Sequence, residues 1–266
     1  MRPGPDSGLL ATVTNTLRLL QEFTYAEPVL GVSELGRRLG ISKSSVHRIL
    51  STLCHEGFVS RTTDGRYRLG YTLHELGQRV VHSTRLHEAA QPVLQQLRND
   101  TGETTHLAVL DGTGVVYLER FESPGMVRLL GSLGTRMPAH ATSSGKCLLA
   151  WGTAAQVDEV IAAGLERLAP RTLTSPELFR AQLADVRRQG YATAFEERLK
   201  GIASVGAPVF GADGLIKAAI SVAGPTLRVN RDSLPRHIAL VGRAGATISQ
   251  HLGYRIPRAD PAISSD

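Results

Sequence analysis

Apolar residues in the N-terminal third of the chain recur with the period of amphipathic helices. Steps of three and four residues predict a first helix and, after a loop over 25–31, a second short helix that ends at Gly40. Glycine adopts the left-handed conformation of a helix end without a Cβ clash, so Gly40 is a natural stop. The apolar positions are Val13, Leu17, Leu20 and Phe23 in the first helix and Leu35 and Leu39 in the second.

A third helix with a clean apolar face is predicted directly after this glycine. Ser42 is a good N-cap, because its side-chain oxygen can accept a hydrogen bond from a free backbone N–H group. Two helices joined by a tight glycine-containing turn form a helix-turn-helix, whose second helix meets DNA through its N-terminal residues. The apolar face of the third helix holds Val46, Ile49, Leu50 and Leu53, and its polar face holds Lys43, Ser44, Ser45, His47, Arg48 and Ser51.

A basic β-hairpin is predicted next, because Asp64-Gly65 lies between two short strand-like runs. A helix-turn-helix followed by such a hairpin is a winged helix, and the alternative is a small helical bundle with an incidental hairpin. Residues 31–68 contain seven Lys or Arg against three Asp or Glu, which suits a polyanionic partner. The predicted DNA contacts are Ser42, Lys43, Ser44, Ser45, His47, Arg48, Arg61, Arg66 and Arg68.

The remaining two thirds of the chain mix helical and strand patterns. Apolar runs around glycine-rich turns predict hairpins, and their mixture with amphipathic helices indicates an α+β fold with an antiparallel sheet. Strands are predicted over 106–111, 115–119, 126–130, 202–210 and 215–222, and helices over 71–84, 86–102, from 144, from 176 to 190, and over 234–252.

Composition excludes several classes of protein. The chain of 266 residues is 42% hydrophobic and 20% charged, which argues against a disordered chain, a collagen-like repeat or a coiled-coil rod. No run approaches the roughly 18 apolar residues of a membrane-spanning helix, and the first ten residues lack the apolar core of a signal peptide. Two cysteines are too few for a disulfide framework. We therefore expect a cytoplasmic protein with no membrane partner.

Three segments of the chain resemble the IclR (isocitrate-lyase-regulator) family of bacterial transcription regulators. They are GVSELGRRLGISKSSVHRILSTLCHEGFVSRTTDGRYRLG at 31–70, GTRMPAHATSSGKCLLA at 134–150 and GYATAFEERLKGIASVGAPVFGADGLIKAAISVAGP at 190–225. The resemblance implies a winged helix-turn-helix domain over 9–70, a linker helix over 71–84 and an effector-binding domain over 85–254. That last domain is expected to have a GAF-like antiparallel sheet flanked by helices.

The resemblance also implies a function. Members of the family bind DNA and sense small organic or aromatic carboxylic acids, and repression is commoner among them than activation. They form dimers, which often pair into tetramers. The expected partners are therefore a double-stranded DNA operator, a small carboxylate effector and further copies of this chain, and no cofactor or metal is predicted.

A run of small residues over 141–145 marks the expected effector site. Its backbone and hydroxyl groups can approach a ligand closely, and a helix beginning at Ser144-Gly145 offers free N–H groups to an anion. The resemblance adds contacts on later strands, where ordinary hydrogen bonding in a sheet is the alternative for the serines. Two alanines there favour a pocket larger or less polar than the smallest keto acids need. The predicted effector residues are Thr142, Ser143, Ser144, Gly145, Ala194, Ser204, Ser221 and Ala223, while Tyr117 and Trp151 are expected in the core.

Two other functions stay open from the residues alone. An enzyme acting on a small acid could use Cys147 with His140 or His106, although an apolar run around Cys147 favours a buried, inert thiol. Glu196 and Glu197 make a poor acid/base pair, because neighbours on a strand face opposite ways. We expect one of them to cap a loop or a helix end and the other to be solvated. The second alternative is a DNA-binding protein without an effector.

Overall fold

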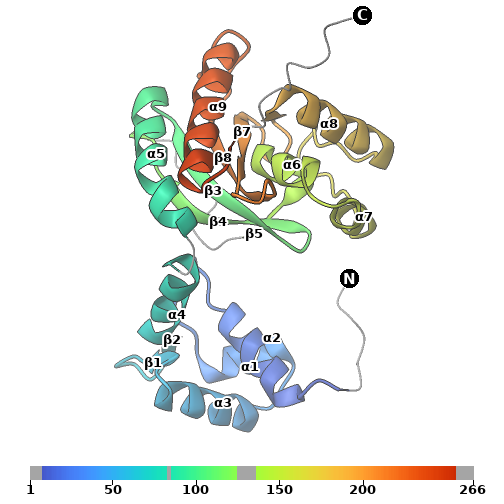
Figure 1. The fold of residues 1–266 in the computed structure, drawn as a ribbon. Coiled ribbons are helices and arrows are strands. Elements are labelled where there is room, and N and C mark those ends of the chain that lie inside the picture. The colour runs from blue at the N-terminus through green and yellow to red at the C-terminus, as the bar shows by residue number, and fades with distance from the viewer. Residues whose placement is uncertain (1–7, 83–84, 125–135, 256–266) are drawn as a thin grey trace, which may run out of the picture. The chain divides into compact units, whose positions relative to one another are not determined.

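The computed structural model describes residues 8–82, 85–124 and 136–255 (Figure 1). The chain forms two compact units, the first over residues 1–83 and the second over 84–266. Among the described helices, none is long and apolar enough to cross a membrane.

The first unit has the element order of a winged helix-turn-helix, as the sequence predicted. Its core gathers apolar side chains from three helices, from both strands of a hairpin and from the loop between the first two helices. A fourth helix follows the hairpin. The elements are α1 (Ala11–Gln21), α2 (Val32–Leu39), α3 (Lys43–His55), β1 (Val59–Arg61), β2 (Tyr67–Leu69) and α4 (Tyr71–His82).

The apolar face predicted for the first helix is partly wrong. Val13 and Leu17 are 50% and 56% exposed, whereas Leu19 is completely buried. Leu20 and Phe23 do pack into the core, as predicted. Helix α1 carries apolar residues on more than one side, and the side that meets α2 is centred on Leu19. Periodicity alone does not decide which of two apolar sides finds a packing partner.

The turn between α2 and α3 forms as predicted from its local signals. Gly40 has a φ of +67°, the left-handed conformation that glycine adopts most readily. Ser42 caps α3, because its Oγ accepts a hydrogen bond from the Ser45 backbone N–H at 3.1 Å. The predicted apolar face of α3 is buried along its whole length. These contacts fix the direction of α3 relative to α2.

Tyr67 links the hairpin to the loop between α1 and α2. Strands β1 and β2 pair antiparallel, with Arg61 opposite Tyr67. Tyr67 is buried and exchanges two backbone hydrogen bonds of 2.9 Å with Leu30 in the loop between α1 and α2. The charged turn between the strands therefore extends from a fixed base.

A six-stranded antiparallel sheet forms the centre of the second unit, in the order β5-β4-β3-β8-β7-β6. This confirms the predicted fold class and the two predicted hairpins. The predicted strand at 126–130 lies outside the described residues, and β5, β6 and α7 were not predicted. The elements are α5 (Arg85–Thr101), β3 (Thr104–Asp111), β4 (Gly114–Phe121), β5 (Arg136–Pro138), η1 (Ala139–Ala141), α6 (Ser143–Ala150), α7 (Ala154–Ala162), α8 (Pro176–Gln189), β6 (Ala192–Phe195), β7 (Ile202–Phe210), β8 (Ile216–Pro225) and α9 (Leu234–His251).

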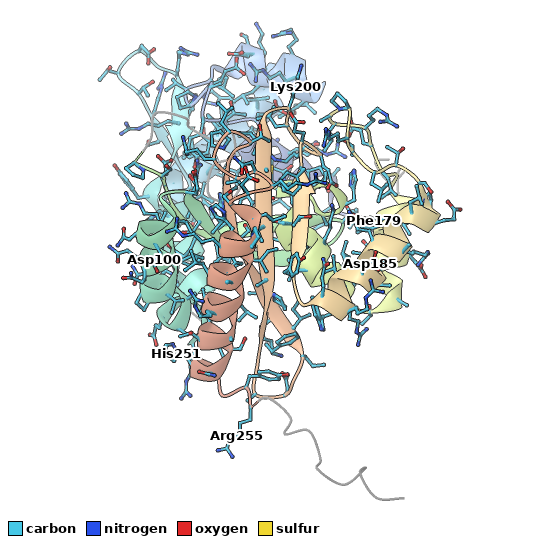
Figure 2. All side chains as sticks on the ribbon, turned by 90° about the horizontal axis from the view of Figure 1, so that it is seen from above. Asp100, Phe179, Asp185, Lys200, His251 and Arg255 are labelled. Carbon is cyan, nitrogen blue, oxygen red and sulfur yellow. The ribbon has the colours of Figure 1, made fainter. Side chains whose placement is uncertain are left out.

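Helices cover both faces of this sheet and give the second unit two apolar cores. Helices α5 and α9 pack on one face, and α6, α7 and α8 enclose the core on the other. In Figure 2, Phe179 and Asp185 of α8 lie on the opposite side of the long strands from His251 of α9. Helix α6 is buried at every residue, which brings its N-terminal end directly onto the sheet.

Candidate functional site

The polar side of α3 is open to solvent over its first two turns. Because the apolar positions recur with the helical period, the side chains between them all point outward. The hydroxyl of Ser42 lies 2.9 Å from those of both Ser44 and Ser45, so three serines form one hydroxyl cluster. We call the following six exposed residues the α3 surface: Ser42, Lys43, Ser44, Ser45, His47 and Arg48.

The basic surplus of the first unit is distributed unevenly. Arg38 on α2 lies within 4 Å of three carboxylates, those of Glu22, Glu27 and Glu34, and it lowers the pKa of Glu27. Its charge is therefore offset inside the unit. In the described part of the chain, Lys43 and Arg48 form no ion pair with an acidic side chain, so their positive charge remains available to an outside partner.

The three hairpin arginines are exposed, but two of them also hold the hairpin in place. An Nη2 group of Arg66 donates to the Val29 backbone oxygen at 2.6 Å, and Nε of Arg68 donates to Ser60 Oγ at 3.0 Å. A guanidinium carries five N–H donors, so both keep donors for a phosphate. Arg61 projects beside the glycine of the hairpin turn.

Residues of α1 that the sequence analysis did not select lie beside the α3 surface. A groove of about 300 Å³ runs between the two helices. Thr12, Asn15 and Thr16 line it from α1, and Ser45 and Arg48 line it from α3. Their spacing in the sequence could have indicated this groove, because Thr12, Asn15 and Thr16 stand at i, i+3 and i+4 and so share one polar side of α1.

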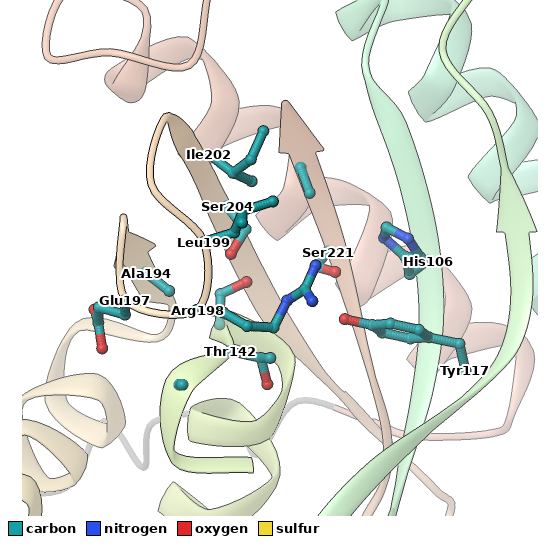
Figure 3. Close-up of a pocket in the computed structure, with 13 residues that line it drawn as sticks. His106, Tyr117, Thr142, Ala194, Glu197, Arg198, Leu199, Ile202, Ser204 and Ser221 are labelled. Carbon is teal, nitrogen blue, oxygen red and sulfur yellow. The ribbon is translucent and has the colours of Figure 1, made fainter. Parts of the chain in front are cut away.

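The second unit holds a cavity between the sheet and the N-terminal end of α6 (Figure 3). Its free volume of about 40 Å³ is room for a few water molecules. Strand register brings residues far apart in the sequence to its walls, because Ala194 pairs with Ser204, Ser204 with Ala223 and His106 with Ser221. The predicted effector residues that line it are Thr142, Ser143, Ala194, Ser204, Ser221 and Ala223.

Ser144 and Gly145 do not line this cavity. A Cβ on Gly145 would lie 2.2 Å from the Ala139 backbone oxygen, so glycine is needed there for α6 to pack against the turn η1. The Gly145 N–H group donates to Thr142 Oγ1 at 3.1 Å and is not free for an anion. Both residues stay predictions as ligand contacts, whereas the packing role of Gly145 follows from the geometry.

A buried ion pair supports the cavity wall and corrects one expectation. Lys146 is completely buried, and its Nζ lies 2.6 Å from each carboxylate oxygen of Glu197. The same Nζ donates to the Thr193 backbone oxygen at 3.0 Å. One of the two glutamates was expected to be solvated. Glu197 is instead buried and paired with Lys146. Glu196 does cap its loop, by accepting a hydrogen bond from the Gly201 N–H group.

The cavity also contains basic and aromatic groups that the sequence analysis did not assign to it. Arg198, from the loop after β6, extends between Thr142 and Ser221 towards Tyr117 (Figure 3). Tyr117 stacks on His106 with ring centroids 4.3 Å apart. Both rings line the cavity, so Tyr117 is not only a core residue. The charged residues over 196–200, which stand between two apolar strand-like runs, could have indicated this loop in the sequence.

Burial controls the ionisation of the two stacked rings. It lowers the pKa of His106 to about 3, with a further contribution from the positive charges of Arg120 and Arg198. Burial raises the pKa of Tyr117, against smaller lowering effects from Arg198 and from the Ser144 hydroxyl. Both rings are therefore neutral near pH 7. Arg198 brings positive charge to the cavity, while the carboxylate of Glu197 in its wall is paired with Lys146.

Comparison with protein families assigns both units. The description "Bacterial transcriptional regulator IclR C-terminal" matches residues 78–250, and "IclR helix-turn-helix domain" matches residues 12–63. The chain belongs to the IclR family. This confirms the family resemblance seen in the sequence.

Relatives in the IclR family match the chain over nearly its whole length. The HTH-type transcriptional regulator XynR of Escherichia coli K12 is 34% identical over 248 residues, covering 92% of this chain and 98% of XynR. KdgR of the same organism is also 34% identical, covering 94% of this chain and 95% of KdgR. A solved IclR homologue from Microbacterium hydrocarbonoxydans, complexed with 4-hydroxybenzoate, has a TM-score of 0.83 at 30% identity and covers 91% of this chain and 99% of its own.

Membership of the IclR family makes this chain a DNA-binding transcription regulator and not an enzyme. The surroundings of Cys147 agree with that assignment. Its side chain is completely buried among apolar residues, and burial raises the pKa of the thiol to about 12. A thiol in this position stays protonated and does not serve as a nucleophile.

Proposed function

We propose that this IclR-family protein is a repressor that binds operator DNA through the α3 surface and the basic hairpin. The observation that carries the proposal is the exposure of Ser44, Ser45 and Arg48 at the N-terminal end of α3. Short hydroxyls and a guanidinium there suit base edges in a major groove, and Lys43 suits a phosphate. His47 and Ser42 complete this contact, while Arg61, Arg66 and Arg68 hold adjacent phosphates.

We propose that the operator is recognised by two copies of the chain. A helix-turn-helix dimer reads half-sites about 34 Å apart, one turn of the DNA helix, so the operator is expected to be nearly palindromic. Helix α4 joins the two units within each copy and contributes to the dimer contact. Two such dimers then pair to form a tetramer.

The effector that fits the cavity best is a small carboxylic acid. Arg198 supplies a positive charge, Thr142, Ser204 and Ser221 supply hydroxyls, and the charge of Glu197 is offset by Lys146. The relative that was solved with 4-hydroxybenzoate supports a carboxylic acid as the class of effector. Binding changes DNA affinity only if the acid prefers one arrangement of the DNA-binding units over the other, and we propose that it prefers the one that releases DNA.

The DNA half of the proposal is tested by fluorescence anisotropy with the DNA flanking the coding region of the protein. Phosphate contacts predict that the logarithm of affinity falls linearly with the logarithm of salt concentration. Arg48→Ala should weaken binding at least about fivefold, because each good base contact contributes about 1–3 kcal/mol. Arg188→Ala, which removes an exposed arginine of α8, is the control. Binding that is independent of salt, or equal losses in both variants, contradicts the proposal.

The effector half is tested by thermal unfolding of the full chain with small carboxylic acids, including 4-hydroxybenzoate. An acid that raises the unfolding temperature should also lower DNA affinity in the anisotropy assay. Arg198→Gln should abolish the thermal shift and leave DNA binding without ligand unchanged. A shift that survives Arg198→Gln would remove this arginine as the anchor of the carboxylate.

A further inference from the structure

The wall of the cavity contains two buried polar atoms that make no hydrogen bond within the described part of the chain. They are Nδ1 of His106 and Oγ of Ser143. His106 is 4% exposed and Ser143 is 1% exposed, so bulk water reaches neither side chain freely. Buried polar atoms are nearly always paired, and an exception in the wall of a cavity indicates a partner that enters the cavity.

His106 is positioned by the register of the sheet and by one aromatic neighbour. It lies on β3 opposite Ser221 on β8, and its ring stacks on Tyr117 from β4. Figure 3 shows His106 on the β3 side of the cavity, with Arg198 entering from the loop after β6. A guest in this cavity therefore meets a cation and an imidazole that come from different walls.

The chemistry of the two groups differs. The arginine is charged and attracts a carboxylate. The imidazole is neutral near pH 7, so its Nδ1 offers one hydrogen bond, either as a donor or as an acceptor according to the tautomer. A hydroxyl group can pair with Nδ1 in both tautomers, and a keto oxygen can accept from Nδ1–H. A plain hydrocarbon group at this position leaves Nδ1 without a partner.

We infer that His106 is the specificity-determining residue of this cavity and that its Nδ1 selects acids bearing a second oxygen group, a hydroxyl or a keto group, over the corresponding plain acids. This inference rests on the proposed function, because it takes the cavity as the site of a small carboxylate. Arg198 holds the carboxylate and contributes equally to both kinds of acid. Ser143, which lines the same cavity from α6, offers a second hydrogen bond to the guest.

The test compares matched acids by isothermal titration calorimetry on the full chain. The probes are propionate against lactate and pyruvate, and benzoate against 3- and 4-hydroxybenzoate. In at least one set, the oxygen-bearing acid should bind about tenfold or more tightly, since a site that hydrogen-bonds an oxygen group rejects the analogue without it. His106→Phe keeps an aromatic ring beside Tyr117 but removes Nδ1. In this variant the plain acid and the oxygen-bearing acids of each set should bind equally.

Further outcomes separate this inference from the proposed function. His106→Asn, which places an amide where the imidazole nitrogen was, should keep part of the preference and guards against a folding defect in His106→Phe. Arg198→Gln should weaken both acids by the same factor. Equal binding of plain and oxygen-bearing acids to the natural protein, or a preference that survives both His106 variants, overturns the role of His106 alone. Failure of every acid to bind overturns the proposed function and this inference together.

Discussion

The α3 surface and the surroundings of the cavity in the second unit use the same kinds of side chain in opposite environments. Both combine serine hydroxyls with basic groups. On α3, Lys43 and Arg48 are exposed and, within the described residues, have no acidic partner. Behind the cavity wall, Lys146 is completely buried and its Nζ lies 2.6 Å from the carboxylate of the wall residue Glu197.

The difference follows from the free energy of removing a charge from water. An exposed ion pair contributes at most about 1 kcal/mol, so a surface cation can stay unpaired until DNA arrives. A buried charge costs several kcal/mol in lost hydration and needs a partner within the fold. Lys43 is therefore available for binding, whereas Lys146 is part of the folded structure. Surroundings, and not residue type, separate the two uses.

Breaking the buried pair is expected to have the largest effect. Lys146→Met leaves the Glu197 carboxylate buried without its cation, so the free energy of unfolding of the second unit should fall by about 3–5 kcal/mol. Urea unfolding followed by tryptophan fluorescence measures this loss. Trp151 is the single tryptophan of the chain and packs against a core of the second unit, so its signal reports on that unit.

A matched exposed pair provides the control. Lys217 Nζ also lies 2.6 Å from a carboxylate oxygen, that of Asp213, but the two side chains are 42% and 48% exposed. Lys217→Met should cost no more than about 1 kcal/mol. Adding Glu197→Gln to Lys146→Met should restore part of the lost stability, because it removes the unpaired charge. Equal losses in the two lysine variants would show that burial does not distinguish the pairs.

The first unit could be predicted closely because its signals are local. The glycine stop, the Ser42 cap and the apolar spacing of α3 all act within a few residues, and they decide which side of the helix faces outward. The Asp64-Gly65 turn does the same for the hairpin. The local argument fails at α1, where Leu19 and not Val13 or Leu17 packs inward, because a distant element selects the buried side.

The cavity could be predicted only in part because its walls depend on strand register. Six of the eight predicted effector residues line the cavity, whereas Ser144 and Gly145 of α6 do not. Glu197 stands 51 residues after its partner Lys146, and no local pattern indicates that pairing. His106 and Arg198 enter the site through the order of the strands and the path of one loop. A charge pattern in the sequence does not state which charges the fold will bury.

Lowering the pH from 7 to 5 should reduce the free energy of unfolding of the second unit by about 2 kcal/mol through His106. Burial lowers the pKa of His106 to about 3, below the ordinary histidine value of 6.5, so between these values only the unfolded chain binds the proton. Stability contributed by the neutral imidazole is therefore lost as pH falls below 6.5, at up to about 1.4 kcal/mol per pH unit. Urea unfolding at pH 7 and at pH 5, followed by Trp151 fluorescence, measures the loss.

The histidine variant separates this loss from other titrations. His106→Phe has no imidazole at this position, so the stability difference between the natural protein and the variant should shrink by about 2 kcal/mol from pH 7 to pH 5. His47→Gln, which replaces an exposed imidazole on the α3 surface, leaves the environment of His106 unchanged and is the control. A stability difference that does not change with pH would mean that His106 can take up a proton in the folded protein.

The smallest effect is expected on the exposed side of the comparison. Ser42→Ala removes the oxygen that accepts from the Ser45 N–H group, so α3 should lose about 1 kcal/mol, the usual contribution of an N-cap. Hydrogen exchange of the α3 amides in the full chain measures this loss. Ser51→Ala, at an exposed position in the middle of the same helix, is the control and should change the exchange rates of these amides little. Unchanged exchange in Ser42→Ala would mean that packing alone fixes the start of α3, and an equal change in both variants would mean that any exposed serine hydroxyl on α3 matters as much as the cap.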